Sequence, residues 1–69
     1  MWGGQLIKAY NVEKQKWLCA YLKQHLTAKE ENASVFIDEE HLDKYIIKIG
    51  LNPINFQKIR CDYRGNRIG

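Results

Sequence analysis

Apolar residues recur at helical spacing in the first long segment without glycine or proline, residues 12–26. The apolar positions are Trp17, Leu18, Tyr21, Leu22 and Leu26. Asn11 precedes the segment and is a good helix cap, because its side-chain oxygen can accept hydrogen bonds from free backbone N–H groups. The pattern therefore predicts a first helix over residues 12–26 with one broad apolar face.

The segments on either side of this helix have less regular patterns. Residues 5–10 can form a short strand or an early turn of the helix that follows. Residues 27–33 are mainly polar and predict a loop. Val35, Phe36 and Ile37 make a β-prone row that is too short for a helix, so we expect a short strand at residues 34–37.

A second helix is predicted over residues 39–49. Asp38 can cap it, and two glutamates follow in the first turn, where the helix dipole favours negative charge. Glu40 and Lys44 can form an ion pair one turn apart. Gly50 can adopt the left-handed backbone conformation that ends a helix.

A third helix is predicted over residues 53–61, directly after a sharp turn. Asn52 can cap it, and Pro53 suits a first helical position, because the N–H that proline lacks has no partner there. The second and third helices would then bury one common set of apolar side chains. This set is Leu42, Tyr45, Ile49, Leu51, Phe56 and Ile59.

Residues 64–67, Arg-Gly-Asn-Arg, contain the glycine and asparagine of a tight turn. Cys61 and Tyr63 on one side and Ile68 on the other can form a short hairpin around it. Alternatively, Gly65 can be the C-cap of an extended third helix.

The segment from Leu42 to Cys61, LDKYIIKIGLNPINFQKIRC, resembles the helix-turn-helix of DNA-binding proteins, in which a polar and basic second helix enters the major groove. With the C-terminal hairpin, the order of elements from Asn11 to Gly69 resembles a winged helix. The resemblance implies an α+β, mainly α fold, with a three-helix core and a small β-hairpin. It implies a single small domain over residues 1–69, which can be a fragment of a longer protein.

The resemblance also implies sequence-specific binding to duplex DNA, by a small transcriptional regulator or a recombination accessory protein. Asn55 and Gln57 would hydrogen-bond adenine edges, and Ile54 would touch a thymine methyl group. Lys58 and Arg60 would reach guanine or phosphate, while two arginines on the wing would hold phosphates. The residues expected to bind DNA are Asn52, Ile54, Asn55, Gln57, Lys58, Arg60, Arg64 and Arg67.

Charge is distributed unevenly along the chain, whose formal net charge is +3. Residues 1–28 carry a net charge of +3, residues 29–43 of −5 and residues 44–69 of +5. Basic charge thus lies on the half that contains the predicted recognition helix, as expected for a nucleic-acid-binding protein.

A second hypothesis is a protein-interaction module, an inhibitor or adaptor that docks an acidic partner. Ile47 and Ile54 lie off the predicted core face and would be exposed apolar residues. They are also the expected contacts of a possible homodimer. Binding to generic duplex DNA that weakens steeply with salt would distinguish the two hypotheses, because neutralised phosphates release counterions.

Length and residue types argue against catalysis. Sixty-nine residues make one small core, in which a catalytic pocket is hard to enclose. His25 and His41 lack the spacing of a zinc helix, and Cys19 and Cys61 have no CxxC partner. We therefore expect no enzyme, metal or cofactor, and we expect Cys19 to be a small buried residue.

The sequence predicts neither a membrane segment nor a secretory leader. The longest uncharged run is the nine residues from Ile49 to Gln57, against about twenty needed to cross a bilayer. The first four residues lack basic charge and an apolar stretch. Two cysteines are too few for a secreted disulfide scaffold, so we expect an intracellular protein with free thiols, in the cytoplasm, the nucleoid or a eukaryotic nucleus.

Overall fold

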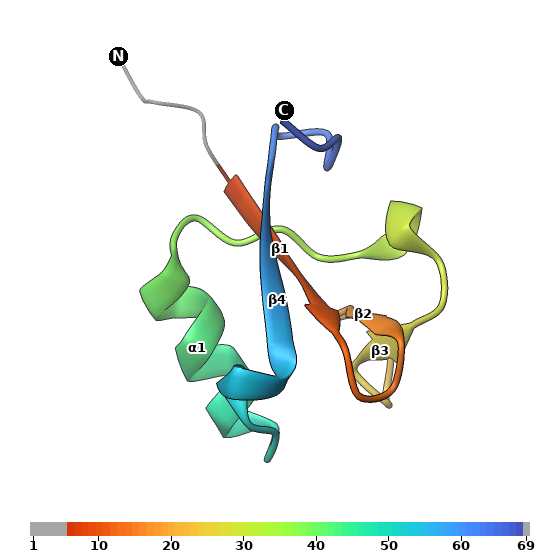
Figure 1. Ribbon diagram of the computed structural model, residues 1–69, viewed down its shortest axis with the longest axis vertical. Helices are drawn as coiled ribbons and strands as arrows, with labels where there is room; N and C mark the ends of the chain where they lie inside the picture. The colour runs from red at the N-terminus through yellow and green to blue at the C-terminus, as the bar shows by residue number, and fades with distance from the viewer. Residues whose placement is uncertain (1–5, 69) are drawn as a thin grey trace.

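The computed structural model describes residues 6–68, which form a four-stranded antiparallel sheet with one α-helix packed on one face (Figure 1). The strands are β1 (Leu6–Asn11), β2 (Lys16–Leu18), β3 (Leu26–Thr27) and β4 (Phe56–Cys61), in the order β3-β2-β1-β4. The helix is α1 (Glu39–Lys48), and two 3₁₀ turns, η1 (Glu30–Asn32) and η2 (Pro53–Asn55), lie in the connections. The prediction of a mainly α fold with a three-helix core is therefore wrong.

β1 is a central strand that pairs on both sides. It pairs with β4 over its whole length and with β2 near its end. Phe36 pairs with β1 near the start of that strand, since Ile7 and Phe36 exchange backbone hydrogen bonds of 2.9 and 2.7 Å. The strand alternative is thus correct for residues 6–10, while residue 5 lies outside the described residues. Of the strand predicted at residues 34–37, only Phe36 pairs.

The predicted helix over residues 12–26 is wrong, because this segment forms the β1–β2 hairpin, a turn and the short β3. The Asn11 side chain accepts a hydrogen bond of 2.8 Å from a backbone N–H three residues on, so the expected helix cap closes a turn. Gln15 then adopts a left-handed conformation (φ 57°), which interrupts any right-handed helix. Tyr21 and Leu22, expected on the buried face, are 90% and 44% exposed.

The predicted second helix is confirmed as α1, which ends one residue before the predicted end. The Asp38 carboxylate accepts a hydrogen bond of 2.8 Å from the backbone N–H of His41, and Gly50 is left-handed (φ 87°). The expected Glu40–Lys44 pair forms at 3.4 Å. Among residues 6–68, no helix has the length and apolar character that a membrane crossing needs.

The predicted third helix begins as expected but does not continue. Asn52 accepts a hydrogen bond of 3.1 Å from the Ile54 N–H, and Pro53 occupies the first position of η2. After three residues the chain enters β4, where β1 supplies the backbone partners of an entire strand. This long-range pairing overrides the helix propensity of the glutamine, lysine and arginine in the segment. The prediction of a recognition helix over residues 53–61 is wrong.

The C-terminal segment forms the predicted tight turn. The carboxylate of Asp62 accepts hydrogen bonds of 2.8 and 3.0 Å from two backbone N–H groups of the turn. Cys61 and Arg67 form an isolated antiparallel bridge, and the Ile68 N–H donates to the Arg60 carbonyl at 3.1 Å. The last described residues therefore begin a fifth row beside β4.

The main core lies between α1 and one face of the sheet, which we call the helix-covered face. Its buried members are Ala9, Leu18, Leu26, Leu42, Ile46 and Phe56. Tyr45, Ile49 and Leu51 pack against this core while half-buried, in agreement with prediction. Ile59, also predicted to be in this core, lies three residues after Phe56 in the strand and therefore points to the opposite face.

Candidate interaction surface

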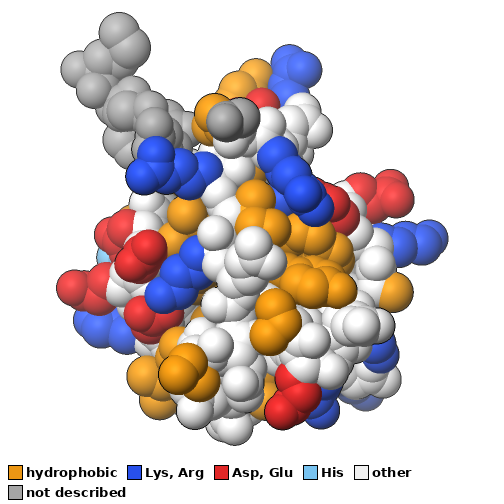
Figure 2. Space-filling view, in the orientation of Figure 1, with side chains coloured by type: hydrophobic (Ala, Val, Ile, Leu, Met, Phe, Trp, Pro, Cys, Tyr) orange, Lys and Arg blue, Asp and Glu red, His pale blue; other side chains and the backbone are white. Residues whose placement is uncertain are grey.

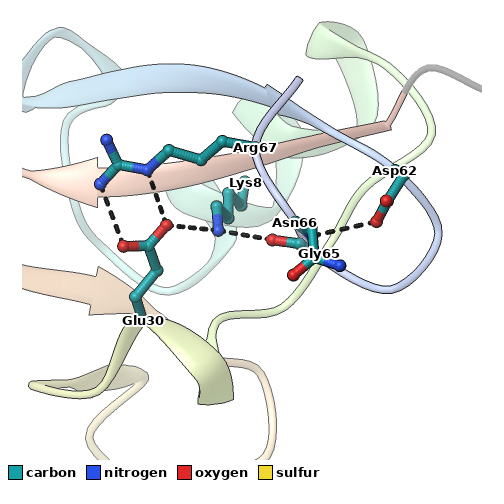
Figure 3. Close-up of polar contacts among 6 residues, drawn as sticks. All are labelled: Lys8, Glu30, Asp62, Gly65, Asn66 and Arg67. Atoms are coloured by element: carbon teal, nitrogen blue, oxygen red, sulfur yellow. Dashed lines mark hydrogen bonds and ion pairs between the residues drawn. The ribbon is translucent and has the colours of Figure 1, made fainter. Parts of the chain in front are cut away.

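A buried lysine lies at the centre of a polar cluster on the opposite face of the sheet (Figure 3). Lys8 is 2% exposed, and its Nζ donates hydrogen bonds of 2.6 Å to both Glu30 and the Gly65 carbonyl. Arg67 donates two hydrogen bonds, of 2.7 and 3.0 Å, to the Glu30 carboxylate. Both cations lie over Trp17, with Lys8 Nζ 5.1 Å and Arg67 Cζ 5.5 Å from the ring centroid. The cluster joins β1, β2, η1 and the C-terminal turn.

The charges of this cluster are satisfied within it. Hydrogen bonds from Arg67 and then Lys8 lower the pKa of Glu30 to about 2, and the Glu30 carboxylate raises the pKa of Arg67. A cleft of about 240 Å³ opens beside these side chains, but both cations that line it already contact Glu30. We interpret Lys8, Glu30 and Arg67 as a structural latch, called the Lys8 latch below, that holds the C-terminal turn against the sheet.

Three of the residues predicted to bind DNA lie in or beside η2. The side chain of Asn52 caps this turn, and the backbone of Asn55 accepts a hydrogen bond of 3.0 Å from the Val12 N–H. Ile54 is 81% exposed. Because η2 has only one turn, these residues do not line the face of a recognition helix.

Three more of the predicted residues lie on β4, where they divide between two faces. Gln57 is exposed on the opposite face, whereas Lys58 and Arg60 point to the helix-covered side, because strand side chains alternate. Lys58 Nζ lies 2.9 Å from the Asp43 carboxylate of α1, in an ion pair without hydrogen-bond geometry. The expected common groove-facing surface is therefore absent from β4.

The two arginines predicted on a wing have different surroundings. Arg64 Nε donates to the hydroxyl of Tyr63 at 3.1 Å, and its guanidinium lies 5.4 Å from that ring centroid. Arg67 belongs to the Lys8 latch. Of the four predicted cationic contacts, Lys58 and Arg67 are thus paired with carboxylates, while Arg60 and Arg64 are exposed without one among residues 6–68.

Three exposed apolar side chains lie on segments that meet at one end of the molecule. Val12, Ile47 and Ile54 are 52%, 63% and 81% exposed. The hydrogen bond from Val12 to Asn55 places Val12 beside η2, and the contact between α1 and η2 brings the last turn of the helix to the same end. Figure 2 shows hydrophobic side chains over the end of α1 and η2. We call Val12, Ile47 and Ile54 the apolar end.

Basic residues flank the apolar end. Lys14 and Lys16 belong to the β1–β2 hairpin that follows Val12, and Lys48 follows Ile47 in the last turn of α1. None of these three lysines forms an ion pair with another residue in the 6–68 range. The surface therefore combines apolar side chains with uncompensated positive charge.

The side chains considered for catalysis have structural surroundings. Cys19 and Cys61 are free and buried, as expected of Cys19. His25 Nδ1 lies 2.9 Å from the hydroxyl of Tyr45, whose pKa is raised by burial. A second cleft, of about 360 Å³, lies between the loop after β2 and η1. Across residues 6–68, no group of three or more His, Cys, Asp or Glu side chains is placed to hold a metal ion.

Sequence reasoning missed the Lys8 latch and the place of Val12 in the apolar end. Lys8 offered one signal, since it is the single charged residue in the strand segment LIKAYN, where a lysine must lie among apolar neighbours. Glu30 lies 22 residues away, and no local pattern indicates that it faces Lys8.

Comparisons with known proteins do not assign the chain to a family. No protein-family model matches it, and neither the curated proteins nor the solved structures include a significant match.

Proposed function

We propose that this chain is a protein-interaction module that docks an acidic partner protein through the apolar end. The observation that supports this most directly is the exposure of Ile54 (81%), Ile47 (63%) and Val12 (52%), on segments that meet at one end of the molecule. Removing apolar surface from water is favourable by about 25 cal/mol per Å² before the costs of association are subtracted, and neighbouring exposed apolar residues often mark an interaction site.

The charge around the apolar end defines the chemistry of the partner. Lys14, Lys16 and Lys48 present three ammonium groups without an ion pair among residues 6–68, while Glu13 lies in the same hairpin and Asp43, one helical turn before Ile47, is paired with Lys58. A partner that places apolar side chains on the apolar end and carboxylates at its rim is complementary in both respects. Such complementarity speeds association and excludes partners of the wrong charge.

Duplex DNA receives less support as the partner. The recognition helix required by the helix-turn-helix hypothesis is absent, because residues 56–61 form a strand. Of the residues assigned to the major groove, Gln57 points to one face of that strand, and Lys58 and Arg60 point to the other. Arg60 and Arg64 are the exposed cations that remain from the predicted set.

A peptide selection tests the proposal, because it requires no identified partner. A phage-displayed library of twelve-residue peptides would be selected against the immobilised wild-type protein, and the affinities of selected peptides measured by fluorescence anisotropy. We expect acidic peptides with apolar residues, whose affinity falls at least about tenfold on Ile54→Ser, as for an interface hot spot. Tyr63→Ser is the matched control, because Tyr63 is 70% exposed in the C-terminal turn, away from the apolar end.

Two results would contradict the proposal. One is a set of selected peptides that bind Ile54→Ser as tightly as they bind the wild type. The other is mixed-sequence duplex DNA that binds the wild type with a steep salt dependence while peptides do not, because that dependence is the signature of phosphate neutralisation.

A further inference from the structure

We infer that the docked partner lies along the outer edge of β4 as an extended acidic strand, which adds a row to the sheet and leads onto the apolar end. This inference rests on the proposed function, because it specifies the form in which the partner binds. It follows from the backbone of β4, from the row that Ile68 begins and from the charges on the strand.

β4 is an edge strand, and half of its backbone polar groups point away from the sheet. Val12 donates to the Asn55 carbonyl, and in an antiparallel ladder hydrogen-bonded pairs alternate with non-bonded ones. Gln57 and Ile59 therefore bond β1, whereas the N–H and C=O of Lys58 point outward. No group among residues 6–68 hydrogen-bonds these two atoms of Lys58, and no other ribbon lies in front of β4 in Figure 1.

The row beside β4 has already begun at its C-terminal end. The Ile68 N–H donates to the Arg60 carbonyl at 3.1 Å, and Arg67 bridges Cys61 in antiparallel orientation. This pairing reaches Arg60, and the next outward-facing residue along β4 is Lys58. A partner strand in the same direction would bond the amide and carbonyl of Lys58 and then pass Phe56 toward Ile54. Addition of a strand to a free sheet edge is an established mode of peptide recognition.

The side chains along β4 determine which strand fits. β4 carries two cations, Lys58 and Arg60, and no carboxylate. A residue directly opposite Lys58 would project on the same face, where an aspartate or glutamate meets Arg60, which has no carboxylate partner among residues 6–68, beside the Lys58–Asp43 ion pair. The neighbouring residues of the added strand would project on the other face, beside the half-buried Ile59. The strand that fits therefore alternates acidic and apolar side chains.

A second copy of this chain fits the same edge poorly. Antiparallel pairing of two β4 strands around Lys58 would place two lysines directly opposite each other, which is unfavourable. The same register would place Phe56 of the second copy opposite Arg60, where Ile68 already lies. An acidic partner strand avoids both conflicts.

Two substitutions at position 58 separate the contribution of the Lys58 backbone to peptide binding from that of its side chain. Lys58→Pro removes the outward N–H, which makes no bond to β1, and proline is tolerated in edge strands at such positions. Lys58→Ala is the matched control, because it keeps the N–H and removes the same side chain and its ion pair with Asp43. Amide exchange of Ile59, which bonds β1, would show that both variants keep the ladder.

The probes are the twelve-residue peptides selected from the phage-displayed library against the wild type. We expect the peptide affinity for Lys58→Ala to lie within about threefold of that for the wild type. The affinity for Lys58→Pro should be at least about tenfold lower, because one backbone hydrogen bond is lost and the pairing next to it is disturbed. Peptide binding should also slow exchange of the Lys58 amide. A second test uses the wild type and peptides that are N-methylated at every other amide. Methylation should weaken binding when it falls on the amides that face β4 and should not when it falls on the amides between them.

The outcomes distinguish the strand from the proposed function. Peptides that lose affinity on Ile54→Ser but bind both Lys58 variants alike would overturn the strand and leave the proposed function standing. Peptides that are insensitive to Ile54→Ser would overturn the proposed function. If N-methylation weakened binding equally in both alternating sets of peptide amides, the inference of an added strand would be overturned, even if Lys58→Pro fails to fold. A wild-type dimer in sedimentation that Lys58→Pro abolishes would overturn the acidic partner in favour of a second copy.

Discussion

Replacing the carboxylate of Glu30 by the amide of similar shape should destabilise the protein strongly. Glu30→Gln leaves Lys8, whose side chain is 3% exposed, with the Gly65 carbonyl but without a charged partner. Breaking a fully buried ion pair costs about 3–5 kcal/mol, because the remaining charge is uncompensated. Since the Glu30 side chain is 35% exposed, solvent screens part of this loss, and we expect a decrease of about 2–3 kcal/mol in the free energy of unfolding.

The same pair predicts a dependence of stability on pH. The pKa of Glu30 is lowered from an ordinary value of 4.5 to about 2 in the folded protein. Its stabilising contribution is therefore complete above the unfolded pKa and is lost as the pH falls from about 4.5 through about 2. The full shift would correspond to about 3 kcal/mol, which exposure reduces to about 1–2 kcal/mol. The difference between wild type and Glu30→Gln should narrow over this interval.

Urea unfolding followed by far-UV circular dichroism, at pH 7, pH 4 and pH 2.5, measures both effects. Glu40→Gln is the control, because Glu40 and its partner Lys44 are 72% and 74% exposed at a separation of 3.4 Å. It should change the free energy of unfolding by at most about 0.5 kcal/mol. A cost of Glu30→Gln no larger than that of Glu40→Gln, or a difference between Glu30→Gln and wild type that does not narrow in acid, would refute the assignment of the Lys8 latch as a stabilising ion pair.

Five further substitutions, at four positions, test other parts of the fold by the same urea unfolding. Phe56→Ala, at a 7% exposed core position, should cost about 3–5 kcal/mol, whereas Gln57→Ala, at the exposed neighbour, should cost less than about 0.5 kcal/mol; similar costs would contradict the register of β4. Asp38→Ala should cost about 0.5–2 kcal/mol, because it removes the cap of α1, and Asp38→Asn should restore most of this. Gln15→Gly should stabilise by up to about 1 kcal/mol, because Gln15 has a φ of 57°; destabilisation would contradict that conformation.

The observed fold changes the surface that residues 52–60 present. A helix-turn-helix would have residues 52–60 present one polar face to a DNA groove. As η2 and β4 they present an exposed isoleucine, two cations and a free backbone edge instead. The residue types of this segment are unchanged, and the proposed docking of an extended acidic peptide rests on the surface that they form as a 3₁₀ turn and a strand.

Features whose hydrogen bonds are local could be predicted from the sequence. α1 was predictable because Asp38 caps it, its bonds lie within the segment and Gly50 ends it. The Asn52–Pro53 start of η2 and the tight turn after Cys61 were predictable for the same reason. Phe56 was predicted to be buried from its spacing in a third helix, and it is buried (7% exposed) although the segment is a strand.

The strands and the surface depend on contacts between distant segments, which the sequence alone does not reveal. β4 bonds β1, at the other end of the chain, and no local signal in residues 56–61 reveals that partner. Likewise the apolar stripe over residues 12–26 has helical spacing, yet its hydrogen bonds are made to β1 and within β2 and β3. The apolar end and the Lys8 latch each combine side chains from segments far apart in sequence. Because a strand is completed by residues that its own sequence does not contain, pairing chose between helix and strand here, and with it the surface that the protein presents to a partner.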